Sequence, residues 1–162
     1  MQAIVAVSKN WGIGRDGRLL FSIPEDMKFF RETTSGKTVI MGRKTLDSMP
    51  GGAPLKNRRN IIISTQEGYT VEGAEVVSSP AAAVALTSGE AQENVFVIGG
   101  GEVYRAMLPF CDRALVTQVE AEPAADKFFP DLDAMEDWQL AKEGGEKEHE
   151  GLKFRFCTYV RK

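Results

Sequence analysis

The sequence has only one histidine and two cysteines, and these low numbers argue against several kinds of catalytic and metal site. His149 lies in a charged, turn-like tract, so a Ser-His-Asp or Cys-His mechanism has no good base. Cys111 and Cys157 have no CxxC spacing, which favours buried free thiols in a reducing compartment over a zinc site or a disulfide. No P-loop, HExxH or GxSxG segment occurs, and we predict no bound metal.

Long apolar runs and a strong charge imbalance are also missing. No stretch approaches the roughly 18 apolar residues of a transmembrane helix, and the first residues lack the charged region of a signal peptide. The 20 basic and 23 acidic residues give a net charge of −3, which offers no electrostatic footprint for a nucleic acid. We therefore expect a cytoplasmic protein with no membrane or nucleic-acid partner, folded as a single domain over residues 1–162.

Short apolar runs alternate with segments of helical pattern. This alternation predicts an α/β fold of three layers, with a mostly parallel central sheet of about eight strands and about four flanking helices. The tail predicts two antiparallel edge strands, 138–142 and 152–160, joined as a hairpin through the polar tract 143–151. The other expected strands are 3–7, 38–41, 61–64, 95–98 and 115–119, and the expected helices are 24–33, 43–48, 80–86 and 102–108.

Asp26 is a carboxylate on the apolar side of the first predicted helix. Pro24 suits the first helical position, and helical spacing then places Asp26 on one stripe with Phe29 and Phe30. An acid buried without a partner is unfavourable, so this position indicates a cationic or hydrogen-bond-donating ligand. The alternative is an ordinary acidic residue that favours the positive end of the helix dipole.

Two glycine turns follow predicted strands, where open α/β sheets bind ligands. Gly99-Gly100-Gly101-Glu102-Val103-Tyr104 opens a helix and allows close approach of a phosphate, although it is an incomplete dinucleotide fingerprint and a plain tight connection stays possible. Gly42-Arg43-Lys44-Thr45 places two cations at a helix start, which suits an anion such as a ribose 2′-phosphate. Solvated surface cations are the alternative. Ser64-Thr65 would add hydroxyl groups at the same edge.

Two loops complete the candidate site. The turn-rich loop 49–60 ends near Arg58 and Arg59, either of which suits a ligand carboxylate or is simply solvated. The connection 8–20 has glycines at its centre and apolar ends, as a mobile lid would, or it is an ordinary surface loop.

Taken together, these segments resemble bacterial dihydrofolate reductases from the first strand to the last. The resemblance rests on the order and spacing of several motifs, none decisive alone: Gly12-Ile13-Gly14, Ile23-Pro24-Glu25-Asp26-Met27, Val39 to Thr45, Asn60 to Ser64, Val97 to Tyr104 and Phe129-Pro130-Asp131. It implies NADPH-dependent reduction of 7,8-dihydrofolate to 5,6,7,8-tetrahydrofolate, with the cofactor supplying the hydride.

For the substrate, the resemblance implies that Asp26 orients and polarises the pterin, with Thr117 bridging to it, while a water delivers the proton. Leu19 and Leu20 would close the lid, and Phe21 stands where the family usually has a tryptophan that helps to hold a water. The apolar walls would come from Ile4, Val5, Met27, Phe30 and Ile98. Arg58, favoured over Arg59 by counting back from Asn60, would pair with the α-carboxylate of the substrate's glutamate.

For the cofactor, the resemblance implies three groups of residues. Ala6, Ile13, Gly14 and Leu19 would lie near the nicotinamide, and Asp126 would contact the lid. Gly42, Arg43, Lys44 and Thr45 would hold phosphates, with Ser64 and Thr65 near the adenosine. Gly99, Gly100, Gly101, Glu102, Val103 and Tyr104 would cover the pyrophosphate side, with a cis Gly99-Gly100 bond; some relatives have a cation at the position of Glu102.

The resemblance also implies a monomer that is inhibited by diaminopyrimidine or pteridine antifolates. Two other functions stay open at this stage. One is the reductase domain of riboflavin biosynthesis, which has a similar fold and uses NADPH, and which the combination of Asp26, Thr117 and Arg58 disfavours. The other is a non-catalytic nucleotide-binding module, in which Asp26 is only a helix-dipole residue.

Overall fold

The computed structural model describes residues 1–162 and consists of twelve strands, four α-helices and four short 3-10 helices. The strands are β1 (Gln2–Val7), β2 (Gly12–Arg15), β3 (Arg18–Leu19), β4 (Thr38–Gly42), β5 (Arg59–Ile63), β6 (Ala74–Val77), β7 (Val95–Gly99), β8 (Arg113–Val119), β9 (Lys127–Phe128), β10 (Trp138–Glu143), β11 (Lys147–His149) and β12 (Leu152–Arg161). The helices are α1 (Pro24–Thr34), α2 (Arg43–Asp47), α3 (Pro80–Leu86), α4 (Gly101–Met107), η1 (Pro50–Gly52), η2 (Gln92–Asn94), η3 (Leu108–Phe110) and η4 (Leu132–Ala134).

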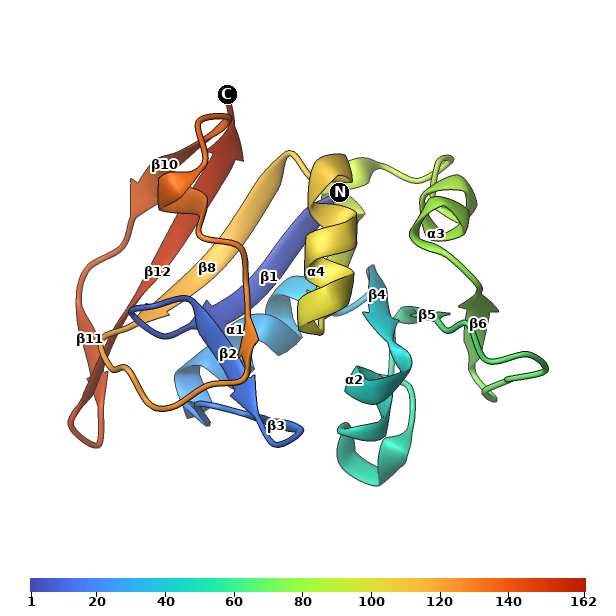
Figure 1. Ribbon diagram of the computed structural model, residues 1–162, viewed down its shortest axis with the longest axis horizontal. Coiled ribbons are helices and arrows are strands. Elements are labelled where there is room, and N and C mark those ends of the chain that lie inside the picture. Colours follow the sequence, from blue (N-terminus) through green and yellow to red (C-terminus); the bar gives the residue numbers. More distant parts are fainter.

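The central sheet has the strand order β10-β12-β8-β1-β7-β4-β5-β6 (Figure 1). Every pair from β8 through β6 is parallel, whereas β12 runs antiparallel to β8 and β10 runs antiparallel to β12. The apolar sequences of β1, β4, β5 and β7 suit parallel strands that are covered on both faces. The predicted fold class is therefore confirmed.

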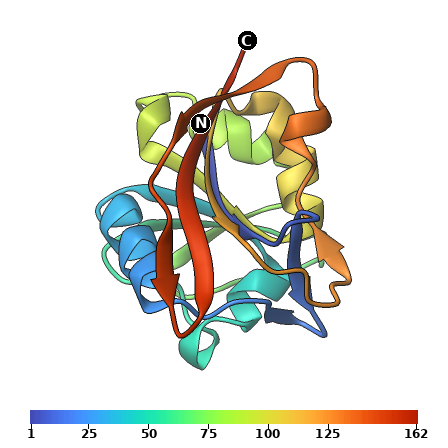
Figure 2. The same cartoon turned by 90° about the vertical axis from the view of Figure 1, so that its left-hand side faces the viewer.

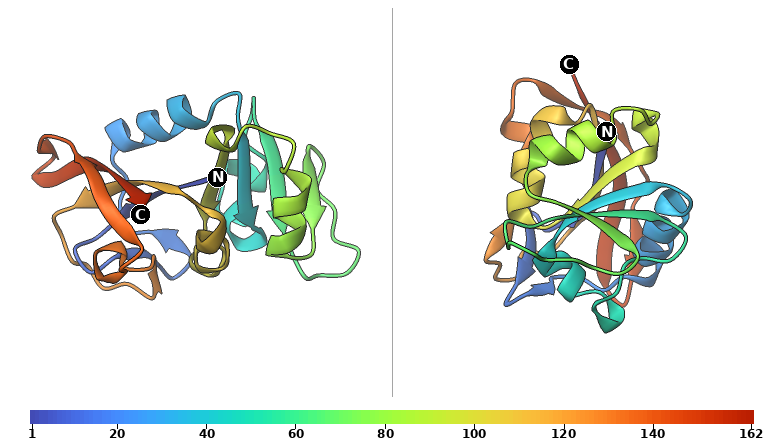
Figure 3. Two further views of the ribbon diagram at one scale, coloured as in Figure 1. Left: turned by 90° about the horizontal axis from the view of Figure 1, so that it is seen from above. Right: turned by 90° about the vertical axis from the view of Figure 1, so that its right-hand side faces the viewer.

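Helices cover both faces of the sheet and make the three layers. Figure 3 shows α1 and α4 on opposite sides of the strands, and Figure 2 shows the same two helices flanking the β12 edge. On the α1 side, Phe29, Phe30 and Leu46 pack with Ile4 and Ile98. On the α4 side, the larger core gathers Tyr104 and Met107 with side chains from β1, α3, η4 and the C-terminal strands. Each strand alternates its side chains between these two cores.

The segment predicted as a mobile lid forms strands. β2 pairs with β3 and with β9 in a separate three-stranded antiparallel sheet. Asp126 ties the segment to the chain before β9: its N–H donates to the Gly14 carbonyl at 3.0 Å, and its Oδ2 accepts from the Asp16 N–H at 3.0 Å. The expected contact between Asp126 and the lid is present.

The C-terminal hairpin is confirmed, but its connecting tract contains another strand. β11 pairs with β12 through a turn at Glu150 and Gly151, both with positive φ. Gly144 lies between β10 and β11, where a Cβ would come within 2.7 Å of the Phe156 carbonyl oxygen. Only glycine fits so close to the backbone of β12. Gly144 therefore separates β10 from β11, which both pair with β12.

Candidate active site

Asp26 is held in the first turn of α1 and faces the end of the parallel sheet. Its Oδ1 accepts a 2.6 Å hydrogen bond from the Thr117 hydroxyl on β8, and its Oδ2 accepts none from the protein. Burial raises the pKa of Asp26 above its ordinary value, and the Thr117 hydrogen bond partly opposes that rise. The helix-dipole reading alone does not explain this position, because Asp26 lies on the half-buried side of α1, whereas Glu25 and Lys28 are exposed.

The walls beside Asp26 are apolar. Ile4 is 5% exposed and Ile98 is 9% exposed, and both belong to the cluster against which Phe30 packs. Val5 was expected in the same wall, but its side chain packs against the core on the opposite face, as strand alternation requires. Met27 is 56% exposed, so its side chain lies largely in solvent rather than in a closed wall.

Two apolar residues that the sequence analysis did not include also line this side. Met49 and Leu55 pack against the cluster that contains Ile4 and Ile98. Met49 and Leu55 belong to a loop rich in proline and glycine. Such loops are usually exposed to solvent, so this composition gave no reason to assign these two side chains to the site. The available signal was the presence of apolar side chains just before Arg58.

The glycine turn after β7 is joined through α4 to β1, the strand next to β8 in the sheet. The Gly99-Gly100 peptide is cis, as expected. Tyr104 on α4 reaches back to β1, where its hydroxyl donates to the Ile4 carbonyl at 2.7 Å. Burial raises the pKa of Tyr104 well above its ordinary range, and the negative charge of Asp26 adds to that rise.

The turns after β4 and β7 lie against each other. A Cβ on Gly42 would come within 3.1 Å of Val103 Cγ2, and one on Gly100 within 3.4 Å of Thr45 Oγ1. The absence of a side chain at these glycines lets the starts of α2 and α4 approach each other closely. Ala6, opposite Thr117 in the β1–β8 register, is half-buried at the end of β1.

Cationic and hydroxyl groups follow along the same edge. Gly42 is in register with Ile63, so α2, which starts at Arg43, and the segment that starts at Ser64 leave the sheet at the same edge. Arg43 Nη1 lies 3.2 Å from Asp47 Oδ2, whereas Lys44 is exposed and forms no ion pair. Ser64 Oγ accepts from the Gln66 N–H at 3.1 Å, and Glu102 is exposed on α4.

The lid residues divide into buried and exposed sets. Ile13 is 7% exposed, and its Cδ1 would lie 3.9 Å from a Cβ on Gly101, which places β2 against the start of α4. Gly14 is buried nearby. Leu19 is 82% exposed and is not packed over the cleft, and Phe21 packs against the cluster of Ile23, Val119 and Phe154.

The two adjacent arginines have different environments. Arg59 is held by carboxylates, with Nε 2.6 Å from Glu75 and Nη1 2.9 Å from Glu90. Arg58 forms no ion pair, its buried Nε lacks a hydrogen-bond partner, and its guanidinium carbon lies 5.9 Å from the centre of the Phe30 ring. Burial lowers the pKa of Arg58, and the positive charge of Arg31 contributes to that decrease. Arg58 therefore keeps a guanidinium available at the apolar wall.

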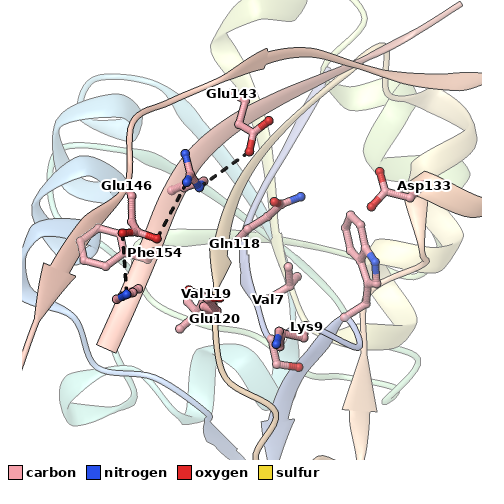
Figure 4. Close-up of a pocket in the computed structure, with 13 residues that line it drawn as sticks. Val7, Lys9, Gln118, Val119, Glu120, Asp133, Glu143, Glu146 and Phe154 are labelled. Carbon is pink, nitrogen blue, oxygen red and sulfur yellow. Dashed lines mark ion pairs between the residues drawn. The ribbon is translucent and has the colours of Figure 1, made fainter. Parts of the chain in front are cut away.

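A separate polar cavity of about 340 Å³ lies away from Asp26 (Figure 4). Gln118, the neighbour of Thr117 on β8, lines it and donates to the Tyr159 hydroxyl at 2.7 Å. Because consecutive residues of a strand point to opposite faces, Gln118 faces away from Asp26. This cavity does not contain the predicted site residues.

The half-buried Asp26 and the glycine turns lie where parallel α/β sheets bind their ligands, which indicates an α/β enzyme with its site at this edge of the sheet. Comparison with known proteins names the family. The dihydrofolate reductase family model matches residues 1–161. No helix has the length and apolar character needed to cross a membrane.

Curated relatives agree over nearly the whole chain. A dihydrofolate reductase of Mycobacterium tuberculosis is 41% identical over 153 residues, covering 92% of this chain and 90% of that protein. One of Neisseria meningitidis is 38% identical, covering 98% and 96%, and one of Bacillus subtilis is 35% identical, covering 98% and 93%. The chain belongs to the dihydrofolate reductase family.

Proposed function

We propose that this enzyme reduces 7,8-dihydrofolate to 5,6,7,8-tetrahydrofolate with NADPH as the reductant. The observation that carries the proposal is the setting of Asp26. Its Oδ1 receives the Thr117 hydroxyl and its Oδ2 has no partner within the protein, while the surrounding wall is apolar. A flat ring that presents N–H donors fits that free acceptor, because a half-buried carboxylate is stabilised when both of its oxygens accept hydrogen bonds.

Asp26 orients and polarises the pterin in this proposal. An ionised carboxylate beside the ring holds it in one orientation and makes its nitrogen atoms more basic. We expect a water, not Asp26 itself, to deliver the proton to the ring nitrogen. Phe21 has no N–H with which to hold that water, so the water must take its hydrogen bonds from other groups.

Arg58 takes the other end of the substrate. Its guanidinium lies over Phe30 and has no carboxylate partner, whereas the acids Glu75 and Glu90 already engage Arg59. A carboxylate from the substrate's glutamate would complete charge-assisted hydrogen bonds to Arg58. This contrast supports Arg58 over Arg59 for the role.

In this proposal the cofactor binds at the glycine turns after β4 and β7. Glycine at positions 42 and 100 lets the two turns approach closely, since a Cβ on Gly42 would meet Val103 at 3.1 Å and one on Gly100 would meet Thr45 at 3.4 Å. Backbone N–H groups at such turns suit a pyrophosphate. NADPH, when bound, supplies the hydride that reduces the imine carbon of the pterin. Arg43, Lys44, Ser64 and Thr65 would select the 2′-phosphate, and Glu102 offers no cation to help them. Ala6, Ile13, Gly14 and Leu19 would enclose the nicotinamide end and exclude water.

Diaminopyrimidine and pteridine antifolates would compete at Asp26 through a charge-assisted pair. A monomeric state, a single functional domain over residues 1–162 and a cytoplasmic location stay predictions of the same proposal.

The test is the loss of NADPH absorbance on addition of dihydrofolate to the purified protein. We expect rapid loss that requires both compounds, a much slower rate with NADH, and inhibition by a 2,4-diaminopyrimidine. NADPH consumption that does not depend on dihydrofolate, or no consumption by correctly folded protein, would contradict the proposal.

A further inference from the structure

Met27 is the only exposed methionine of the chain, with 56% of its side chain accessible. The other five are buried or half-buried in the two cores: Met1, Met41, Met49, Met107 and Met135. An oxidant reaches an exposed thioether before a buried one. No step of the hydride transfer proposed above uses this sulfur.

The exposure of Met27 is unusual for its place on α1. Helical spacing puts Met27 on one row with Phe30 and Thr34. Thr34 is fully buried, and Phe30 packs against the apolar cluster of the sheet. Met27 therefore faces the same side as these two residues, and its exposure marks the point where protein atoms no longer cover that side. This opening lies next to Asp26, the neighbour of Met27 in the chain.

A hydroxyl group contacts the sulfur at this opening. Ser22, in the segment before α1, donates from Oγ to Met27 Sδ at 3.8 Å. A thioether is a weak acceptor, whereas a sulfoxide oxygen on the same sulfur is a polar and stronger one. The Ser22 hydroxyl is therefore placed to hold the new oxygen beside Asp26 when the sulfur is oxidised.

The other readily oxidised groups are protected. Both cysteines are buried, and burial raises the pKa of the Cys111 thiol to about 12 and the pKa of Cys157 above its ordinary value. The reactive thiolate form is therefore scarce at neutral pH. Trp11 and Trp138 are buried as well. Met27 is left as the accessible site for a two-electron oxidant.

We propose that Met27 is an oxidation site, at which a hydroperoxide lowers the affinity of the enzyme for dihydrofolate. The peroxide's terminal oxygen forms a bond to Sδ as the O–O bond breaks. The sulfur loses two electrons, and the departing oxygen takes the proton of the transferred one and leaves as water or an alcohol. The polar sulfoxide then stands at the opening that the substrate would cover. The effect on affinity rests on the proposed function, whereas the oxidation itself does not.

Peptide mass spectrometry after limited treatment with hydrogen peroxide tests the site. The tryptic peptide 19–28 contains Met27 as its only methionine, and peptide 128–142 contains only the half-buried Met135. We expect peptide 19–28 to gain one oxygen at least about tenfold faster than peptide 128–142. Equal rates for the two peptides, or faster oxidation at Met135, would overturn the oxidation site.

The KM for dihydrofolate tests the consequence. Peroxide treatment should raise the KM of the wild type about tenfold with a smaller change in kcat, because a polar group then stands at an apolar contact. Met27→Leu cannot form the sulfoxide, so its own KM should be the same before and after treatment. Met135→Leu is the matched control and should keep the sensitivity of the wild type. Methionine sulfoxide reductases with dithiothreitol should return the wild-type KM to its starting value.

Two kinetic results would overturn the proposal. One is an unchanged KM in wild-type protein whose peptide 19–28 is fully oxidised. The other is an equal rise of KM in treated Met27→Leu, since that rise would come from damage elsewhere. Absence of dihydrofolate turnover before any treatment would instead contradict the proposed function, and the oxidation rates of the two peptides would still decide the site.

Discussion

Thr117 Oγ1 lies 2.6 Å from Asp26 Oδ1 and donates the hydrogen bond that joins strand β8 to helix α1. These residues are 91 positions apart in the sequence. The bond fixes one carboxylate oxygen, and the other accepts no hydrogen bond from the protein. The direction in which Asp26 presents its charge is therefore set by the sheet as well as by its own helix.

Asp26→Asn is expected to lower kcat by at least about 100-fold, within the range of one removed electrostatic or acid–base group. The amide keeps the shape but removes the negative charge that polarises the ring. The NADPH dissociation constant should stay within about twofold, measured by fluorescence titration. Glu25→Gln is the control, because Glu25 is the adjacent acid in the same turn, exposed and paired with Lys147 at 3.2 Å. Near-normal turnover of Asp26→Asn would remove Asp26 from the mechanism.

The same substitution should stabilise the fold at neutral pH. Because the folded-state pKa of Asp26 is raised, the folded chain binds the proton more tightly than the unfolded chain does. This contribution to the free energy of unfolding is fully present below the unfolded pKa and is lost as pH rises through the folded pKa. Asparagine does not titrate, so the Tm difference between Asp26→Asn and the wild type should grow with pH over that window.

Thermal unfolding at a series of pH values measures this difference. We expect a gain of a few degrees at neutral pH, since 1 kcal/mol corresponds to about 2–4 °C for a domain of this size. Glu122→Gln, at an exposed position, should show no such trend. A gap that shrinks with rising pH would contradict the cause assigned to the pKa shift.

The sequence predicted the parallel strands and the orientation of Asp26 because both depend on local periodicity. The runs 38–41 and 95–98 are apolar enough to be recognised as buried strands, and helical spacing alone places Asp26 beside Phe29 and Phe30. The resemblance placed both Ile4 and Val5 among the apolar walls around the pterin and the nicotinamide, and strand alternation separates the two side chains. The structure places their side chains on opposite faces of β1.

The lid sheet was not predictable in the same way. β2, β3 and β9 have two to four residues each, and β9 is more than 100 positions from β2 along the chain. Such short strands are stabilised by their pairing, which local propensity does not encode. The different environments of Arg58 and Arg59 are also not encoded locally. They depend on Glu75 and Glu90, which other segments of the chain bring to Arg59.

Gly42→Ala is expected to weaken NADPH binding by about tenfold. The backbone of Gly42 has φ −82°, which alanine adopts freely, so strain does not enter. The new Cβ would lie 3.1 Å from Val103 Cγ2 and push the starts of α2 and α4 apart, an overpacking that costs about 1–3 kcal/mol. Titration calorimetry with NADPH and a thermal melt would measure both effects.

Two further variants isolate that contact. Gly89→Ala should leave affinity unchanged, because a Cβ there meets nothing within 4 Å. Val103→Ala in the Gly42→Ala background should restore part of the affinity by making room. If the double variant binds NADPH no better than Gly42→Ala, the Val103 contact is not the cause.

Arg58→Gln and Arg59→Gln should separate substrate binding from stability at adjacent positions. Arg58→Gln is expected to raise the KM for dihydrofolate roughly 10- to 100-fold, as loss of charge-assisted hydrogen bonds of about 1.5–3 kcal/mol predicts, with a smaller change in kcat. Arg59→Gln should leave the KM for dihydrofolate within about twofold. Its partly exposed ion pairs with Glu75 and Glu90 contribute about 1 kcal/mol or less to the free energy of unfolding after solvent screening, which urea titration can measure. The opposite pattern, with KM raised by Arg59→Gln and unaffected by Arg58→Gln, would transfer the carboxylate site to Arg59, because only a direct contact moves KM without a matching loss of stability.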